Sequence, residues 1–92
     1  MGRANLSHAH MVKISLIDAN LTAANLSHAN LRNADLSSAD LTGTNLTGTD
    51  LTSSNLSGVD MRQATNISEA ILYGTIMCRT MMPDGKENNS NC

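Results

Sequence analysis

The sequence predicts an all-β solenoid, a chain wound into stacked coils of square cross-section. Two observations predict it: Leu or Met recurs at every fifth position from Leu6 to Met61, and the residue two places before each is mostly small. Five residues advance about 140° beyond a full helical turn and reach the opposite face of a strand, which excludes both straight elements. A bend of about a right angle at every repeat points each Leu at one central axis.

Four sides of five residues close one coil, so residues twenty apart should stack at about the 4.8 Å spacing of paired strands. Small residues suit a narrow interior that already holds four Leu side chains per coil. Asn or Asp mostly precedes the Leu, and such residues accept turn geometry and bond to nearby backbone. We expect Leu36→Asp to abolish cooperative unfolding and Ser37→Asp, on the outer wall, to have little effect.

The repeats AANLS around Leu26, NADLS around Leu36 and SADLT around Leu41 resemble the A(D/N)LXX units of the pentapeptide-repeat family. Twelve units in register make the resemblance specific, and it covers most of the chain. It implies a right-handed quadrilateral β-helix, here of about four coils. The MPDG segment, with a Cys upstream and a terminal Cys, is similar to the tails of some cyanobacterial members.

One irregularity follows Met61, because the strict repeat would place Asn66 at the centre of the core. An unpaired amide there is unfavourable, and treating Ala64 as one extra residue removes it. We therefore expect a register shift near Ala64 within a β-helix over residues 1–84, followed by a capping tail over residues 85–92. The shifted central positions are Ile67, Leu72, Met77 and Met82.

The shift leaves apolar residues on the outside of the last coil, where earlier repeats have Asn or Asp. Such a patch is normally covered, and we expect the tail, with its Pro-Asp-Gly turn, to cover it in preference to a second chain. The first coil has no preceding cap, which suggests end-to-end association or a further domain. The candidate interface residues are Ile71, Ile76, Met81, Leu6 and Met11. Cys78 and Cys92 are a candidate disulfide that would fasten the tail, or two thiols in a reducing cytoplasm.

The polar side chains do not predict a catalytic, metal or cofactor site. His8 and His28 should stack, but two imidazoles make half a tetrahedral zinc shell and no third ligand lies in that column. Asp40 and Asp60 should stack on a convex, exposed wall with nothing to separate their pKa values. The sequence therefore predicts that this protein is not an enzyme.

The favoured function is a non-catalytic structural or protein-interaction module with an unknown protein partner, including a homodimer through an exposed coil end. The alternative comes from the resemblance: some family members resemble duplex DNA and bind DNA gyrase. That needs a long acidic surface, and here only residues 33–61 are one-sidedly acidic. A net charge of −2 favours neither a direct nucleic-acid partner nor a membrane, and the lack of a signal peptide favours the cytoplasm.

Overall fold

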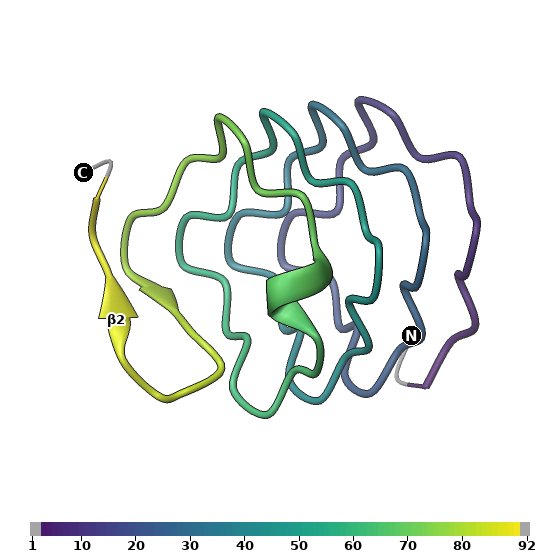
Figure 1. Cartoon of the computed structure of the whole chain (residues 1–92). Helices are drawn as coiled ribbons and strands as arrows, with labels where there is room; N and C mark the ends of the chain where they lie inside the picture. The colour runs from purple at the N-terminus through teal and green to yellow at the C-terminus, as the bar shows by residue number, and fades with distance from the viewer. Residues whose placement is uncertain (1–2, 91–92) are drawn as a thin grey trace.

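A computed structural model describes residues 3–90 of the 92-residue chain. The chain winds about one axis in stacked coils that run from the purple first coil to the yellow tail (Figure 1). Parallel bridges join residues twenty apart, as in Asn5↔Asn25 and Asn25↔Asn45, and equivalent bridges occur on each of the other three sides. The predicted coil of four five-residue sides is therefore correct. Regular elements are short: the 3-10 helix η1 (Ile67–Glu69) and the strands β1 (Thr80–Met81) and β2 (Glu87–Asn88).

Each side of a coil ends in a β-turn. The N–H of Ala9 donates to the carbonyl of Leu6 at 3.1 Å, and the residue between them at the third turn position, His8, has φ of 62°. A positive φ at that position is characteristic of type II turns. Most of these corners are not glycine, although a left-handed conformation costs an L-residue roughly 1–2 kcal/mol. The stacking of the coils must therefore supply the stability that holds the corners in place.

The Asn or Asp before each Leu stabilises the same turn from outside. The Oδ1 of Asn25 accepts hydrogen bonds from the N–H and the hydroxyl of Ser27 at 3.0 and 2.7 Å, and Asp35 does the same with Ser37. These are local Asx turns, in which the side chain takes over a backbone acceptor's role. They explain why a hydroxyl residue so often follows the Leu.

The core is a column of inward side chains along the axis. The Leu residues of the second and third coils, Leu21 through Leu56, are fully buried, and the small residues beside them are 0–2% exposed. Where Thr replaces Ala, its hydroxyl can be satisfied by backbone: the Oγ1 of Thr49 donates to the carbonyl of Leu26 at 2.7 Å. The hydroxyls of Thr44 and Ser54 are buried without a partner within residues 3–90.

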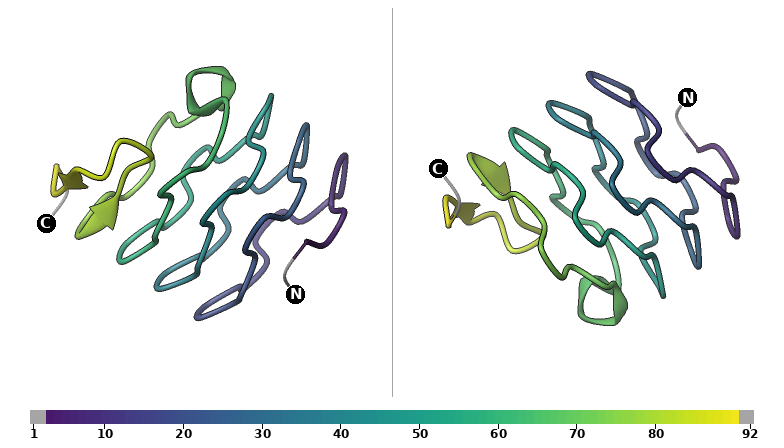
Figure 2. Two further views of the ribbon diagram at one scale, coloured as in Figure 1. Left: turned by 90° about the horizontal axis from the view of Figure 1, so that it is seen from below. Right: turned by 90° about the horizontal axis from the view of Figure 1, so that it is seen from above.

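The register shift lies a few residues later than the sequence predicts. Bridges keep the twenty-residue spacing as far as Asn45↔Thr65 and change to twenty-one at Asp50↔Ile71. Ala64 is not the extra residue, because it is 8% exposed and packs in the core as the small inward residue of its repeat. The chain instead turns outward at Asn66, whose φ is 63° and whose amide donates to the Oγ1 of Thr47 at 2.8 Å. Beyond it, η1 bulges from the edge of the stack (Figure 2).

The tail folds back across the end of the last coil. Strands β1 and β2 pair antiparallel, with Thr80 opposite Asn88 and Met81 opposite Glu87. The N–H of Arg79 also donates to the side chain of Asn89 at 2.8 Å. Met81 is thereby half-buried, but Ile71 and Ile76 remain 48% and 43% exposed. The expectation that the tail covers the whole apolar patch is wrong, because the tail lies over the coil's end and not along its side walls (Figure 1).

Candidate functional site

The outward Asn and Asp side chains on the walls of the solenoid are hydrogen-bonded within their own turns. The Oδ1 atoms of the outward Asn and Asp residues accept hydrogen bonds from residues two positions later, at distances near 3 Å. A side chain held in this way does not change conformation easily and has less capacity left for a ligand. Residues that interrupt the pattern are therefore the informative ones.

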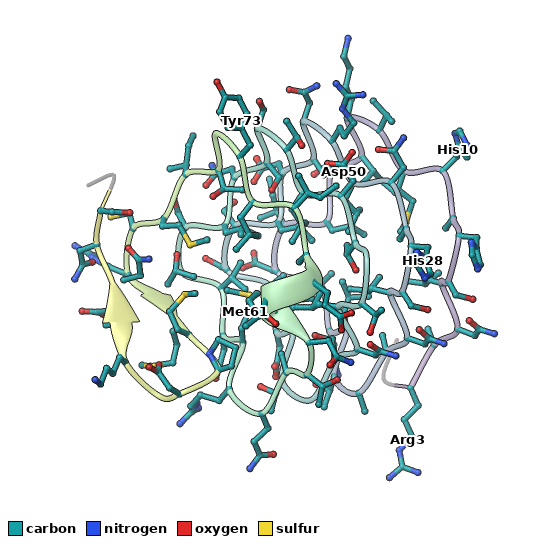
Figure 3. The ribbon with its side chains drawn as sticks, viewed as in Figure 1. Arg3, His10, His28, Asp50, Met61 and Tyr73 are labelled. Atoms are coloured by element: carbon teal, nitrogen blue, oxygen red, sulfur yellow. The ribbon has the colours of Figure 1, made fainter. Side chains whose placement is uncertain are left out.

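The predicted histidine stack is present. The rings of His8 and His28 lie 5.2 Å apart between centroids and are tilted by 13°. Gly48, one coil further, leaves room for His28, because a Cβ there would lie 2.5 Å from its Nδ1. His10 lies on another side of the first coil (Figure 3). Within residues 3–90, no group of three or more His, Cys, Asp or Glu side chains could hold a metal ion.

Two wall carboxylates, Asp60 and Asp50, are paired with arginines. Both arginines lie just outside the one-sidedly acidic stretch of residues 33–61. The Nε and Nη2 of Arg62 donate to the carboxylate of Asp60 at 3.1 and 2.7 Å, and this contact lowers the pKa of Asp60. Arg32 lies 3.9 Å from the carboxylate of Asp50. The hydrogen bonds from Ser37 lower the pKa of Asp35, and those from Thr42 lower the pKa of Asp40. The acids are thus ionised, but part of their charge is compensated.

The interior offers no place for a ligand in the described residues. Fully buried Leu side chains fill the axis, and residues 3–90 enclose no pocket. No helix within those residues has the length and apolar character needed to span a bilayer. The surfaces that residues 3–90 offer to another molecule are the outer walls and the coil ends.

The outward apolar residues gather at the two ends of the solenoid. Ile71 and Ile76 occupy the positions directly above Asp50 and Asn55, and Tyr73, which is 81% exposed, lies beside them and projects from the body (Figure 3). In the first coil, Val12 and Ile17 are 46% and 51% exposed. Ile71 and Ile76 were predicted from the sequence as interface residues, whereas Val12, Ile17 and Tyr73 were not. Their signal was an apolar residue directly after the central Leu or Met, where the repeat usually has Ser or Thr.

The remaining predicted site residues fall into two groups. Leu6 and Met11 are half-buried at the end of the first coil, and Met81 is half-buried under β2. The candidate disulfide needs Cys92, which lies outside the described residues, so the pairing with Cys78 stays a prediction.

The coil geometry has direct counterparts among known proteins. A family model described as pentapeptide repeats (8 copies) matches residues 1–37 and residues 29–65. The chain belongs to the pentapeptide repeat family. The match ends at Thr65. In this pentapeptide-repeat protein, Thr65 is also the last residue whose bridge to the preceding coil keeps the twenty-residue spacing. A search of curated proteins finds no match.

Solved pentapeptide-repeat structures share the fold. The protein alr5209 from Nostoc Pcc 7120 is 35% identical, with a TM-score of 0.78 over 80% of this chain and 60% of its own. A protein from the cyanobacterium Cyanothece 51142 is 33% identical, with a TM-score of 0.67 over 82% and 57%. One from the Arabidopsis thaliana thylakoid lumen is 26% identical, with a TM-score of 0.50 over 79% and 57%. This chain therefore spans 57–60% of the length of these relatives.

Membership sets the class of function. Pentapeptide-repeat proteins are typically structural or interaction modules, and they are generally non-catalytic.

Proposed function

We propose that this protein is a non-catalytic interaction module that binds a protein partner through the outer wall of its last coil. The scaffold is the right-handed quadrilateral β-helix that the family implies, with about four coils counted from the repeats of this chain. The contact surface, which we call the last-coil patch, consists of Ile71, Tyr73 and Ile76. The observation that carries the proposal is the exposure of these apolar side chains at the point where the polar wall pattern stops.

The last-coil patch works against folding stability. Ile71 and Ile76 stack on Asp50 and Asn55, whose side chains bond to their own turns, and an Ile cannot make that bond. Burying an Ile side chain in a partner recovers about 1.5–3 kcal/mol, whereas about half of each remains in water here. Their backbone N–H groups still pair with the coil below, at 2.8 and 3.0 Å, so the positions keep their place in the wall. A contact with an apolar surface accounts for residues that folding alone does not need.

The other surfaces support a binding role and not a chemical one. The axis is filled, and the two histidines lack a third ligand within the described residues. The pairing of Asp60 with Arg62 and of Asp50 with Arg32 weakens the case for the alternative, a DNA-like acidic surface that binds DNA gyrase.

The test replaces Ile71 and Ile76 in the last-coil patch with Asn, the residue that the repeat usually has at these positions. The variant Ile71→Asn/Ile76→Asn should fold at least as stably as the wild type, because Asn can form the Asx turn. Proteins captured by the tagged wild type from cells of the source are identified by mass spectrometry, and binding of each purified candidate is then measured by calorimetry. The matched control, Asn30→Asp, lies on the same wall as Ile71 and leaves that patch intact.

We expect a partner that binds the wild type and the control but is lost from the double variant. A partner that binds all three proteins equally would show that the last-coil patch is not the contact surface. Failure of the wild type to bind any candidate would count against the interaction module itself.

A further inference from the structure

The backbone of the first coil is unpaired on one side. In the second coil, the N–H of Asn25 donates to the carbonyl of Ala4 at 2.9 Å, and its carbonyl accepts from the N–H of Leu6 at 2.8 Å. The residue before each central Leu thus points both backbone groups toward the preceding coil. In the first coil, these groups have no hydrogen-bond partner within residues 3–90. They belong to Asn5, His10, Ser15 and Asn20.

The same end is apolar. Leu6, Met11 and Leu16 are only partly buried, whereas the Leu residues stacked on them in the next coil are 0% exposed. The exposed side chains of Val12 and Ile17 extend this surface onto two walls. We call the first coil's free edge, with these five apolar side chains, the open face. In Figure 1 it is the outer side of the purple coil, with no part of the described chain against it.

We propose that the open face binds a second copy of this chain, with two open faces meeting head to head about a two-fold axis. Turning one copy around reverses the direction in which its coil winds, so the facing edges run antiparallel. In an antiparallel hydrogen-bonded pair, two residues exchange both N–H···O bonds. Each unpaired residue of the open face points both groups outward, which makes the edge self-complementary, as an isologous interface requires.

The charged corners of the first coil are compatible with this arrangement. Going around the coil, the corner residues are Arg3, His8, Lys13 and Asp18. A two-fold axis through the midpoints of opposite walls exchanges neighbouring corners, so it places Asp18 opposite either Arg3 or Lys13. None of these three forms an ion pair within residues 3–90. Opposite charges across an interface favour correct register.

The other end of the molecule explains why the assembly should stop at two. The tail crosses the last coil, with β2 paired to β1 and Asn89 bonded to the N–H of Arg79. A further coil cannot stack there, so residues 3–90 present one open face, and head-to-head contact closes the assembly as a dimer and not a fibre. This inference is independent of the proposed function, because it uses the opposite end of the solenoid.

Sedimentation equilibrium of the 92-residue chain over a concentration series tests the proposal. We expect a mass of twice 9.7 kDa for the wild type. The variant Ile17→Asp replaces an exposed apolar side chain of the open face with a carboxylate. Because the proposed contact would bury that charge, the dimer's Kd should rise at least about tenfold. The matched control, Ser57→Asp, lies in the same column two coils away and should stay dimeric. Circular dichroism spectra of both variants should match the wild type.

Orientation is tested by amine cross-linking, since Lys13 lies in the first coil and Lys86 in the tail. A mixture of isotope-labelled and unlabelled protein distinguishes links between chains from links within one chain. A head-to-head dimer should give Lys13–Lys13 links between chains. A monomer at every concentration, a dimer joined by Lys86–Lys86 links, or an unchanged Kd in Ile17→Asp would each overturn the proposal.

Discussion

Removing the same side chain from two levels of one core column tests how the solenoid holds together. Leu16 and Leu36 occupy equivalent inward positions, twenty residues apart, with Leu56 next in the column. Leu36 is 0% exposed and has a coil on each side, whereas Leu16 is half-buried and has a coil on one side. The substitutions compared are Leu36→Ala and Leu16→Ala.

The magnitude follows from the space that each deletion leaves. At Leu36 the spacing of the flanking coils is fixed by backbone hydrogen bonds near 2.9 Å, such as that from the N–H of Leu36 to the carbonyl of Asn55. The coils therefore cannot move together to fill the cavity that the substitution leaves. A loss of about 3–4 kcal/mol is expected there, within the usual range for buried Leu→Ala. At Leu16 part of the side chain is already in water, and about 1–2 kcal/mol is expected.

Urea unfolding followed by far-ultraviolet circular dichroism measures both losses, at a concentration where sedimentation shows monomers. A chain of this length is stable by roughly 5–14 kcal/mol, so Leu36→Ala should lower the transition midpoint markedly without abolishing the fold. Equal losses at the two positions, or a loss below about 1 kcal/mol at Leu36, would refute the assignment of these residues to one stacked inward column.

Two further predictions concern the corners and the walls. Gly48→Ala should lower the free energy of unfolding more than Gly43→Ala. Both glycines have positive φ, but only a Cβ at Gly48 meets the ring of His28, at 2.5 Å. In a His28→Ala background the two substitutions should therefore cost the same free energy of unfolding, which a double-mutant cycle measures. The lowered pKa values of Asp35 and Asp60 mean that their stabilisation is present above about pH 4 and is lost as the pH falls through the folded-state values. Acid unfolding of Asp35→Asn should therefore depend less steeply on pH than that of the wild type, and an identical pH profile would contradict the role of the Ser37 hydrogen bonds.

The sequence by itself determined the coil and its inward positions. A five-residue period leaves one set of central residues, so the square coil and the stacking of His8 on His28 could be predicted without coordinates. The repeat after the shift was also predictable, because an inward Asn is unfavourable and an inward Met77 is not. Met77 is indeed 5% exposed. These features depend on local pattern, which the chain carries at every repeat.

Contacts between coils were decided by the tertiary structure alone. Placing the extra residue at Ala64 or at Asn66 itself removes the amide from the core equally well, and the bond from Asn66 to Thr47 in the coil below selects the second. Arg32 reaches Asp50 in the same way, across a gap of eighteen residues. Such pairs depend on which side chains meet after stacking, and a five-residue period does not contain that information.

Ser37 shows the same limit at short range. The pattern marks it as a neutral outer position, but its hydroxyl donates to the carboxylate of Asp35 at 2.7 Å, so Ser37→Asp would bring two negative charges together. The path of the tail is the largest feature of this kind. A Pro-Asp-Gly turn predicts that the chain reverses, whereas the pairing of Met81 with Glu87 directs it over the coil's end and leaves Ile71 and Ile76 in water. Periodicity determines which residues face inward, and the contacts between coils determine which outward residues remain available to a partner.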